Sequence, residues 1–180
     1  MTRPTGPFPP PDAPVAPQSD AAAFRDALAR VPAAVVVVAT DGTAGLGGFT
    51  ATAFTSVSDA PPTILVCLNR KSTQTEVFRT NGVFSVNLLP ADGRAVADLF
   101  AGFTKTAAPL RFDPALWQRG AGGVPVLKSA RVVLECRLSA LTPVGSHHVL
   151  FGEVDRVAIK PAAPDAAEIL LYHDRGYREI

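Results

Sequence analysis

Residues 48–62, GFTATAFTSVSDAPP, are the stretch that decides the fold. The stretch carries no charge before Asp59, and it ends at Pro61-Pro62, a pair that stops a strand. Side chains alternate along a strand, so positions 50, 52, 54, 56 and 58 should share one face, on which four residues are Thr or Ser. With Gly47-Gly48 before it, such a face could lie against a flat polar ring and bind its edge. The alternative is a solvent-facing strand in which threonine satisfies β-propensity.

The segments around this stretch predict a mainly β chain. VVVV at 35–38 is a buried strand, and the turn at Asp41-Gly42 leads into residues 45–58 as its hairpin partner. Further strands are expected at 63–69, 83–89, 130–141, 147–159 and 168–173, and a loop-rich segment anchored by Trp117 at 104–123. Because most connections are short, an antiparallel sheet curled into a β-barrel is favoured.

A few short helices complete the expected fold. One begins at Ser19 or Asp20 and runs to Arg30, with residues 24, 28 and 31 on its inner face. The others span 73–80 and 94–100, and Asn81-Gly82 and Gly102 end them. Residues 1–18 hold seven prolines and predict a disordered tail, which leaves 19–180 as the folded domain.

Charge and composition exclude several classes of function. The net charge of +1 provides no basic stripe for a nucleic acid. No apolar run is long enough to cross a bilayer, and the first residues do not look like a signal peptide, so no membrane is expected. Cys67 and Cys136 lack CxxC spacing, and we expect reduced thiols in a cytoplasmic protein.

A phosphate site is suggested by LNRKSTQTE at 68–76. Thr73 and Glu76 fit a capping box, and a helix start presents N–H groups and a positive dipole end to an anion. Arg70 and Lys71 add charge there. The alternative is an ordinary capped surface helix.

Two histidines adjoin in GSHHVLFGEV at 145–154. On a strand, His147 and His148 face opposite sides, so they do not converge on a metal, and no metal site is expected. A histidine at a pocket rim could orient a substrate or move a proton. The alternative is a surface turn histidine.

Taken in order, these segments resemble the flavin reductases of the FMN-binding split-barrel class, the NAD(P)H:flavin oxidoreductase components of two-component monooxygenases. The matching pieces cover about residues 20–178: GFTATAFTSVSDAPP, ILVCLNRKSTQTE, FSVNLLPADGRAVADLFAG, GVPVLKSARVVLECRL, GSHHVLFGEV and LLYHDRGYR. The resemblance implies an antiparallel, Greek-key-like split barrel that forms a homodimer, with the flavin near the subunit interface. It also implies hydride transfer from NADH or NADPH to FMN or FAD, and reduced flavin supplied to a flavin-dependent monooxygenase.

The resemblance also assigns site residues. Flavin contacts are implied for Gly48, Phe49, Thr50, Thr52, Ala53 and Ser56. Contacts with the ribityl phosphate are implied for Cys67, Leu68, Asn69, Arg70, Ser72 and Thr73, and Asn87 is implied to lie near the flavin. The catalytic candidate is His147, associated with the nicotinamide, which Tyr172 and His173 also approach.

One residue departs from the family pattern, and two other functions stay open. The family's Gly-Asp-His motif is Gly145-Ser146-His147 here, so the charge beside the histidine is lost. A barrel that binds flavin or haem without turnover is the main alternative. An oxidase of a pyridoxamine-type substrate would need a cationic cluster beyond Arg70 and Lys71, and the sequence indicates none.

Overall fold

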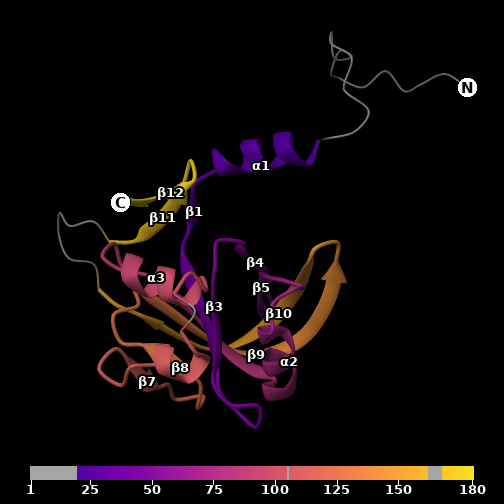
Figure 1. The fold of residues 1–180 in the computed structure, drawn as a ribbon. Coiled ribbons are helices and arrows are strands. Elements are labelled where there is room, and N and C mark those ends of the chain that lie inside the picture. Colours follow the sequence, from indigo (N-terminus) through magenta and orange to yellow (C-terminus); the bar gives the residue numbers. More distant parts are fainter. Residues whose placement is uncertain (1–19, 105, 162–167) are drawn as a thin grey trace, which may run out of the picture.

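The computed structural model describes residues 20–104, 106–161 and 168–180. The expected Pro-rich tail at 1–18 and the candidate cap Ser19 lie outside these residues. The described strands are β1 (Ala33–Ala34), β2 (Val36–Thr40), β3 (Gly47–Ala51), β4 (Phe54–Asp59), β5 (Pro62–Asn69), β6 (Val83–Leu88), β7 (Trp117–Arg119), β8 (Pro125–Leu127), β9 (Val132–Val144), β10 (His147–Ile159), β11 (Leu170–His173) and β12 (Gly176–Glu179). The described helices are α1 (Ala21–Ala29), α2 (Gln74–Asn81), α3 (Arg94–Phe100) and the 3-10 turn η1 (Ala108–Arg111) (Figure 1).

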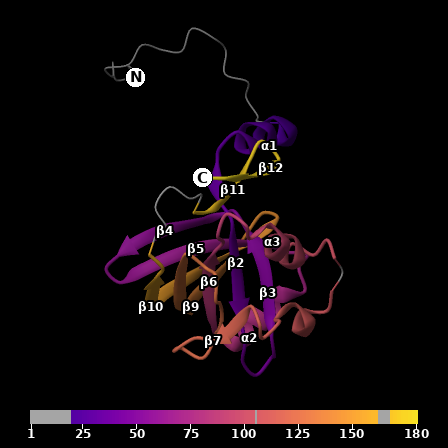
Figure 2. The ribbon, with the colours of Figure 1, turned by 90° about the vertical axis from the view of Figure 1, so that its left-hand side faces the viewer.

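A seven-stranded antiparallel sheet in the order β3-β2-β6-β9-β10-β5-β4 forms the body of the molecule (Figures 1 and 2). Its two edge strands, β3 and β4, are consecutive in the chain, so the sheet must curl until its edges approach. The chain crosses between them at Thr52-Ala53, and the Ala53 carbonyl accepts a hydrogen bond from the N–H of Cys67 on β5 at 3.0 Å. The predicted mainly β, antiparallel split barrel is confirmed.

The single strand expected over residues 45–58 is wrong. β3 pairs with β2, whereas β4 pairs with β5 at the opposite edge of the sheet. Because the strand is interrupted at Thr52-Ala53, the hydroxyl-bearing positions before and after this interruption do not share one face. Period-2 alternation fails at the corner where the barrel closes.

The valines at 35–38 contribute side chains to two separate hydrophobic cores, one on each face of β2. Val36 and Val38 point into the barrel, where they pack with Phe49, Val66 and other interior residues. Residues 35, 37 and 39 point the other way and pack against α3, Trp117 and Leu170. A strand buried on both faces needs apolar side chains at every position, which explains the unbroken run.

Helix α1 does not bury the face that was expected to be internal. Its cap is Asp20, whose Oδ1 accepts from the N–H of Ala22 at 3.1 Å. The side chains of Phe24, Leu28 and Val31 are nevertheless 55%, 53% and 57% exposed. The helix lies outside the barrel beside the small sheet β1-β11-β12 (Figure 1), so the barrel offers its apolar face nothing to pack on.

The sequence analysis missed several short elements, namely β1, β7, β8, β12 and η1. The loop-rich segment contains the β7-β8 hairpin, and the chain ends on β12, which pairs with β11. The expected anchor Trp117 is 5% exposed and packs on Phe112 at 5.0 Å between ring centroids. Strands of three or four residues carry too little periodicity to be recognised.

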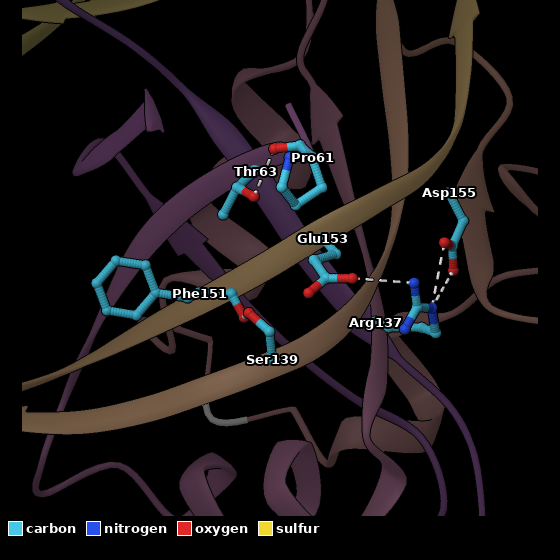
Figure 3. Close-up of polar contacts among 7 residues, drawn as sticks. All are labelled: Pro61, Thr63, Arg137, Ser139, Phe151, Glu153 and Asp155. Carbon is cyan, nitrogen blue, oxygen red and sulfur yellow. Dashed lines mark hydrogen bonds and ion pairs between the residues drawn. The ribbon is translucent and has the colours of Figure 1, made fainter. Parts of the chain in front are cut away.

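The outer face of the β9-β10 hairpin is polar. Arg137 Nη2 lies 3.0 Å from Glu153 Oε2, and its Nε lies 2.9 Å from Asp155 Oδ2 (Figure 3). Ser139 donates to the carbonyl of Phe151 on the same face. Exposed pairs of this kind add about 0–1 kcal/mol each, so they mark the solvent side of the hairpin more than they stabilise it.

Candidate functional site

A cavity of about 540 Å³ lies where the chain crosses between the barrel edges. Its walls come from β3 and the Thr52-Ala53 crossing, from the end of β5 with the start of α2, and from the end of α3. The lining residues are Gly48, Phe49, Thr50, Ala51, Thr52, Ala53, Cys67, Leu68, Asn69, Lys71, Ser72, Thr73, Gln74, Phe100, Ala101, Gly102, Arg111 and His147.

Most of the predicted site residues come together around this cavity. The two sequence segments assigned to the flavin ring and to its phosphate form adjoining walls. The predicted residues that line the cavity are Gly48, Phe49, Thr50, Thr52, Ala53, Cys67, Leu68, Asn69, Ser72, Thr73 and His147.

Five predicted residues do not line this cavity. Ser56 lies on β4, after the interruption at Thr52-Ala53, and is exposed. The Arg70 guanidinium donates to the carbonyl of Gly145 at 3.1 Å, which turns it toward the β9-β10 turn. Tyr172 lines a separate cavity, and His173 lines neither.

Asn87, the fifth, is fully buried and serves the core. Its Nδ2 donates to the Val37 carbonyl at 3.1 Å and to Ser85 Oγ at 2.9 Å. Its Oδ1 accepts from the N–H of Leu127 at 2.9 Å. With these bonds made, the side chain ties β6 to β2 and β8, and its position does not favour the predicted contact with flavin.

The first turn of α2 is capped differently from the prediction. Ser72, not Thr73, provides the cap: its Oγ accepts from the N–H of Gln74 at 3.2 Å, whereas Thr73 makes no side-chain cap bond. Glu76 pairs with Arg79 at 3.0 Å and does not return to the cap. The capping box is therefore wrong, but the helix start still faces the cavity, with Ser72 and Thr73 in its lining.

Packing between β3 and its neighbours shapes the cavity. The N–H of Gly48 donates to Gln74 Oε1 at 2.9 Å, which joins β3 to α2. A Cβ at Gly48 would lie 2.7 Å from the Phe100 ring, so this position has room for glycine alone. Phe100 is held in turn by Phe112 and Trp117, at 5.1 and 5.3 Å between ring centroids.

Two cations line the cavity, and the sequence analysis identified only one of them. Lys71 follows β5, and Arg111 ends η1, where its Nε donates to the Thr106 carbonyl at 2.7 Å. No carboxylate belongs to the lining formed by the described residues. Arg111, Gln74 and Phe100 were missed because each comes from a segment whose pattern indicates structure, not a site.

His147 reaches the cavity from the first position of β10, paired with Asn69. Its Nδ1 lies 2.9 Å from Ser146 Oγ. The serine that stands where the family pattern has aspartate therefore still contacts the imidazole, through a neutral hydroxyl.

The two thiols differ in access. Burial raises the pKa of Cys67, which lines the cavity. Burial, followed by the nearby charges of Asp155 and Glu135, raises the pKa of Cys136 to about 12. Both thiols are free and protonated at neutral pH.

The lining suits a flat polar ring that carries a phosphorylated arm. Backbone amides and hydroxyls from β3 and the crossing segment can bind the ring edge, while Lys71, Arg111 and the start of α2 offer positive charge to a phosphate. The described residues hold no group of three His, Cys, Asp or Glu that could bind a metal ion. None of the described helices has the length and apolarity needed to cross a membrane.

Comparison with known proteins gives consistent similarities. Residues 28–180 match the flavin reductase like domain. The FMN reductase (NADH) RutF of Variovorax paradoxus is 46% identical over 167 residues, which is 93% of this chain and 88% of that protein. BorF, the flavin reductase component of a bacterial two-component tryptophan halogenase, has a TM-score of 0.80 at 31% identity, covering 89% of this chain and 98% of that one. Streptomyces globisporus NADH:FAD oxidoreductase SgcE6, in complex with NAD and FAD fragments, has a TM-score of 0.79 at 28% identity, covering 93% and 97%.

Proposed function

This chain belongs to the flavin reductase like domain family, and from that membership we propose that it is an NADH-dependent flavin reductase with FMN as its flavin. The cavity carries the proposal: it joins amides, hydroxyls and two cations without a lining carboxylate among the described residues. FMN and NADH are preferred to FAD and NADPH because the 46% identical relative is named an FMN reductase (NADH).

The proposed reaction is hydride transfer from the nicotinamide to the flavin, and the cofactors supply this chemistry themselves. The protein holds the two rings in contact, which removes much of the entropic barrier. The backbone N–H groups near Thr52 and Ala53 would stabilise negative charge that develops at the flavin edge. No strong acid or base is needed, in keeping with a lining without carboxylates.

The binding roles follow from position. Lys71, Arg111 and Ser72 would bind the phosphate of FMN. Gly48 and Phe49 would border the ring. His147 would bind the nicotinamide side, with Ser146 as the residue that positions its ring.

The direct test is a NADH-oxidation assay with FMN, FAD and riboflavin, together with an absorption spectrum of the purified protein. We expect FMN to support the highest kcat/KM, and NADH to be preferred to NADPH. A bound flavin spectrum without NADH or NADPH oxidation would instead identify a flavin-binding barrel without turnover.

The assembly is also proposed from the exposed apolar side chains of α1. Phe24 and Leu28 lie at i and i+4, so they share one face of α1, and both are more than half exposed in the single chain, as is Val31 just beyond the end of the helix. We propose that a second copy covers this face in a homodimer. Light scattering after gel filtration should give a dimer mass, and Leu28→Asp should lower it to that of a monomer; Ser56→Asp on exposed β4 serves as control.

A flavin-dependent monooxygenase is the proposed recipient of the reduced flavin; BorF, as the reductase component of a two-component tryptophan halogenase, gives an example of a flavin reductase paired with a second enzyme. The two free thiols favour a reducing compartment, and we propose the cytoplasm. Stimulation of a candidate oxygenase by this protein with NADH and FMN tests the pairing.

A further inference from the structure

Three aromatic rings from separate segments pack against one another beside the cavity. Phe100 ends α3, Phe112 follows η1, and Trp117 begins β7. The ring centroids are 5.1 Å apart between Phe100 and Phe112, 5.3 Å between Phe100 and Trp117, and 5.0 Å between Phe112 and Trp117. Phe100 lines the cavity, whereas Phe112 and Trp117 do not. The cluster therefore joins one wall of the cavity to two rings that lie outside its lining.

The 3-10 turn η1 carries Arg111 to the cavity and is itself weakly fastened. None of its four residues is buried. The hydrogen bond from Arg111 Nε to the Thr106 carbonyl, at 2.7 Å, spans five residues and stays within the same loop. Phe112 comes directly after Arg111, and its half-buried ring packs on the other two rings of the cluster. The position of the Arg111 guanidinium therefore depends on how the Phe112 ring is held.

Trp117 is fixed by contacts that do not involve the cavity. It is buried, its N–H donates to the Asp113 carbonyl at 2.8 Å, and it pairs with Leu127 of β8. Strand β8 is fastened in turn by Asn87, whose Oδ1 accepts from the N–H of Leu127 at 2.9 Å. The indole ring therefore gives Phe112 a surface whose place is set by the barrel sheet.

Phe112 and Trp117 also line a separate cavity of about 280 Å³, together with residues that include Leu46 and Pro125. Because this space adjoins both rings, the Phe112 ring has room to move away from Phe100 when the side chain at position 117 is shortened. A shorter residue at 117 should therefore shift the neighbouring Arg111 without filling the first cavity.

We propose that Trp117 is a positioning residue for the phosphate-binding cation: acting through Phe112, it holds the Arg111 guanidinium where the phosphate of FMN binds. A guanidinium binds phosphate strongly only at hydrogen-bond distance and in a suitable orientation, so a small displacement of Arg111 is enough to weaken the contact. The inference rests on the proposed FMN reductase function. It goes beyond that function by naming a residue outside the cavity that sets the preference for FMN over riboflavin.

The test is isothermal titration calorimetry of FMN and riboflavin on the whole chain freed of bound flavin. Trp117→Leu should weaken FMN roughly tenfold, the loss expected for one charge-assisted hydrogen bond, and leave riboflavin within about twofold. Phe112→Leu, at a half-buried position that tolerates the change, should do the same, and Trp117→Phe should keep most of the FMN affinity. Val86→Ala, which removes volume from the barrel core outside this cluster, is the matched control: it lowers stability and should leave the ratio of FMN to riboflavin affinity unchanged.

A double-mutant cycle shows whether Trp117 acts through Arg111. In the Arg111→Ala background, Trp117→Leu should change FMN affinity by less than about twofold, because the contact it positions is already gone. An undiminished loss in that background overturns the inference, as do equal losses for FMN and riboflavin in Trp117→Leu and Phe112→Leu. Failure of the proposed function is separate, since it appears as no FMN binding or no FMN-dependent NADH oxidation in the wild type.

Discussion

The side chain of Gln74 accepts a hydrogen bond from the backbone N–H of Gly48 at 2.9 Å, and this bond joins two walls of the proposed flavin cavity. Gly48 belongs to β3, at one edge of the barrel sheet, and Gln74 begins α2, which follows β5. This hydrogen bond between segments 26 residues apart therefore helps to fix the distance between the two walls, together with the packing of Phe49 on Phe78 at 5.2 Å between ring centroids.

We expect Gln74→Ala to weaken FMN binding by roughly tenfold, because the N–H of Gly48 loses its partner and the walls can separate. The free energy of unfolding should fall by about 1 kcal/mol, as for one hydrogen bond. FMN titration followed by fluorescence, with urea denaturation, measures both quantities. Gln118→Ala on β7 removes a glutamine outside the cavity and should change neither. FMN affinity equal to wild type in Gln74→Ala would contradict the proposed role of the contact.

Gly48→Ala should damage the same wall by overpacking. The added methyl group would lie 2.7 Å from the Phe100 ring and 3.1 Å from the Val38 carbonyl. We expect a loss of about 1–3 kcal/mol in the free energy of unfolding and weaker FMN binding. The double variant Gly48→Ala with Phe100→Leu should recover part of the FMN affinity, because the smaller side chain gives room to the methyl group. No recovery would mean that the Val38 carbonyl on β2, and not Phe100, limits the position.

The sequence predicted the regular elements well where periodicity and caps agree. Strand β10 and helix α3 have the expected bounds, and α2 ends at Gly82 with a φ of 67°, as a glycine after a helix should. The errors fall where tertiary structure decides. The break at Thr52-Ala53 has no local signal, because it exists only where the two edges of the barrel meet.

The sequence predicted which segments of the chain line the candidate cavity, but not which cationic side chains point into it. Residues in the flavin and phosphate segments line one cavity because both segments end at the same side of the barrel. The direction of a long side chain does not follow from its place in the sequence: Arg70 turns to Gly145, while Arg111, 41 residues away, points to the cavity. Arg94 and Arg175 line one separate cavity although they are far apart in the sequence, and only the fold brings them together.

The phosphate of FMN should depend on Lys71 and Arg111 more than on Arg70. Arg111→Ala and Lys71→Ala should each weaken FMN by roughly tenfold and leave riboflavin, which has no phosphate, within about twofold. Arg70→Ala should have a smaller effect on FMN, since its guanidinium binds the Gly145 carbonyl. Titrations of FMN and riboflavin against each variant give the comparison. Equal losses for the two flavins would place the phosphate away from these cations.

His147→Ala should raise the KM for NADH more than it weakens FMN, because His147 enters the cavity from β10 while the phosphate segment is untouched. Ser146→Ala should raise the same KM by a smaller factor, roughly fivefold, since it removes the hydroxyl 2.9 Å from His147 Nδ1 and leaves the ring in place. Steady-state kinetics with both substrates varied separates the two parameters. His148→Ala, on the opposite face of β10, is the neighbouring control. An unchanged KM for NADH in His147→Ala would remove the nicotinamide role.

The two cysteines should react at different rates with iodoacetamide, and the flavin should change only one of them. Thiolate is the reacting form, and a pKa of about 12 leaves almost none at Cys136 at pH 8, so its alkylation should require unfolding. Cys67 has a raised pKa but lines the proposed flavin cavity, so it should react slowly without FMN and more slowly still at saturating FMN. In urea both should react at one rate.

The raised pKa of Cys136 also makes the stability of the folded protein depend on pH. The folded state holds the Cys136 proton above the usual pKa of 9.0, so its contribution to the free energy of unfolding is complete below pH 9 and is lost as the pH rises toward 12. Cys136→Ala should therefore lose less stability than the wild type between pH 9 and pH 11 in urea denaturation. Peptide mass spectrometry reports the alkylation of each thiol, and rapid labelling of Cys136 in the folded protein at pH 8 would contradict its assigned burial.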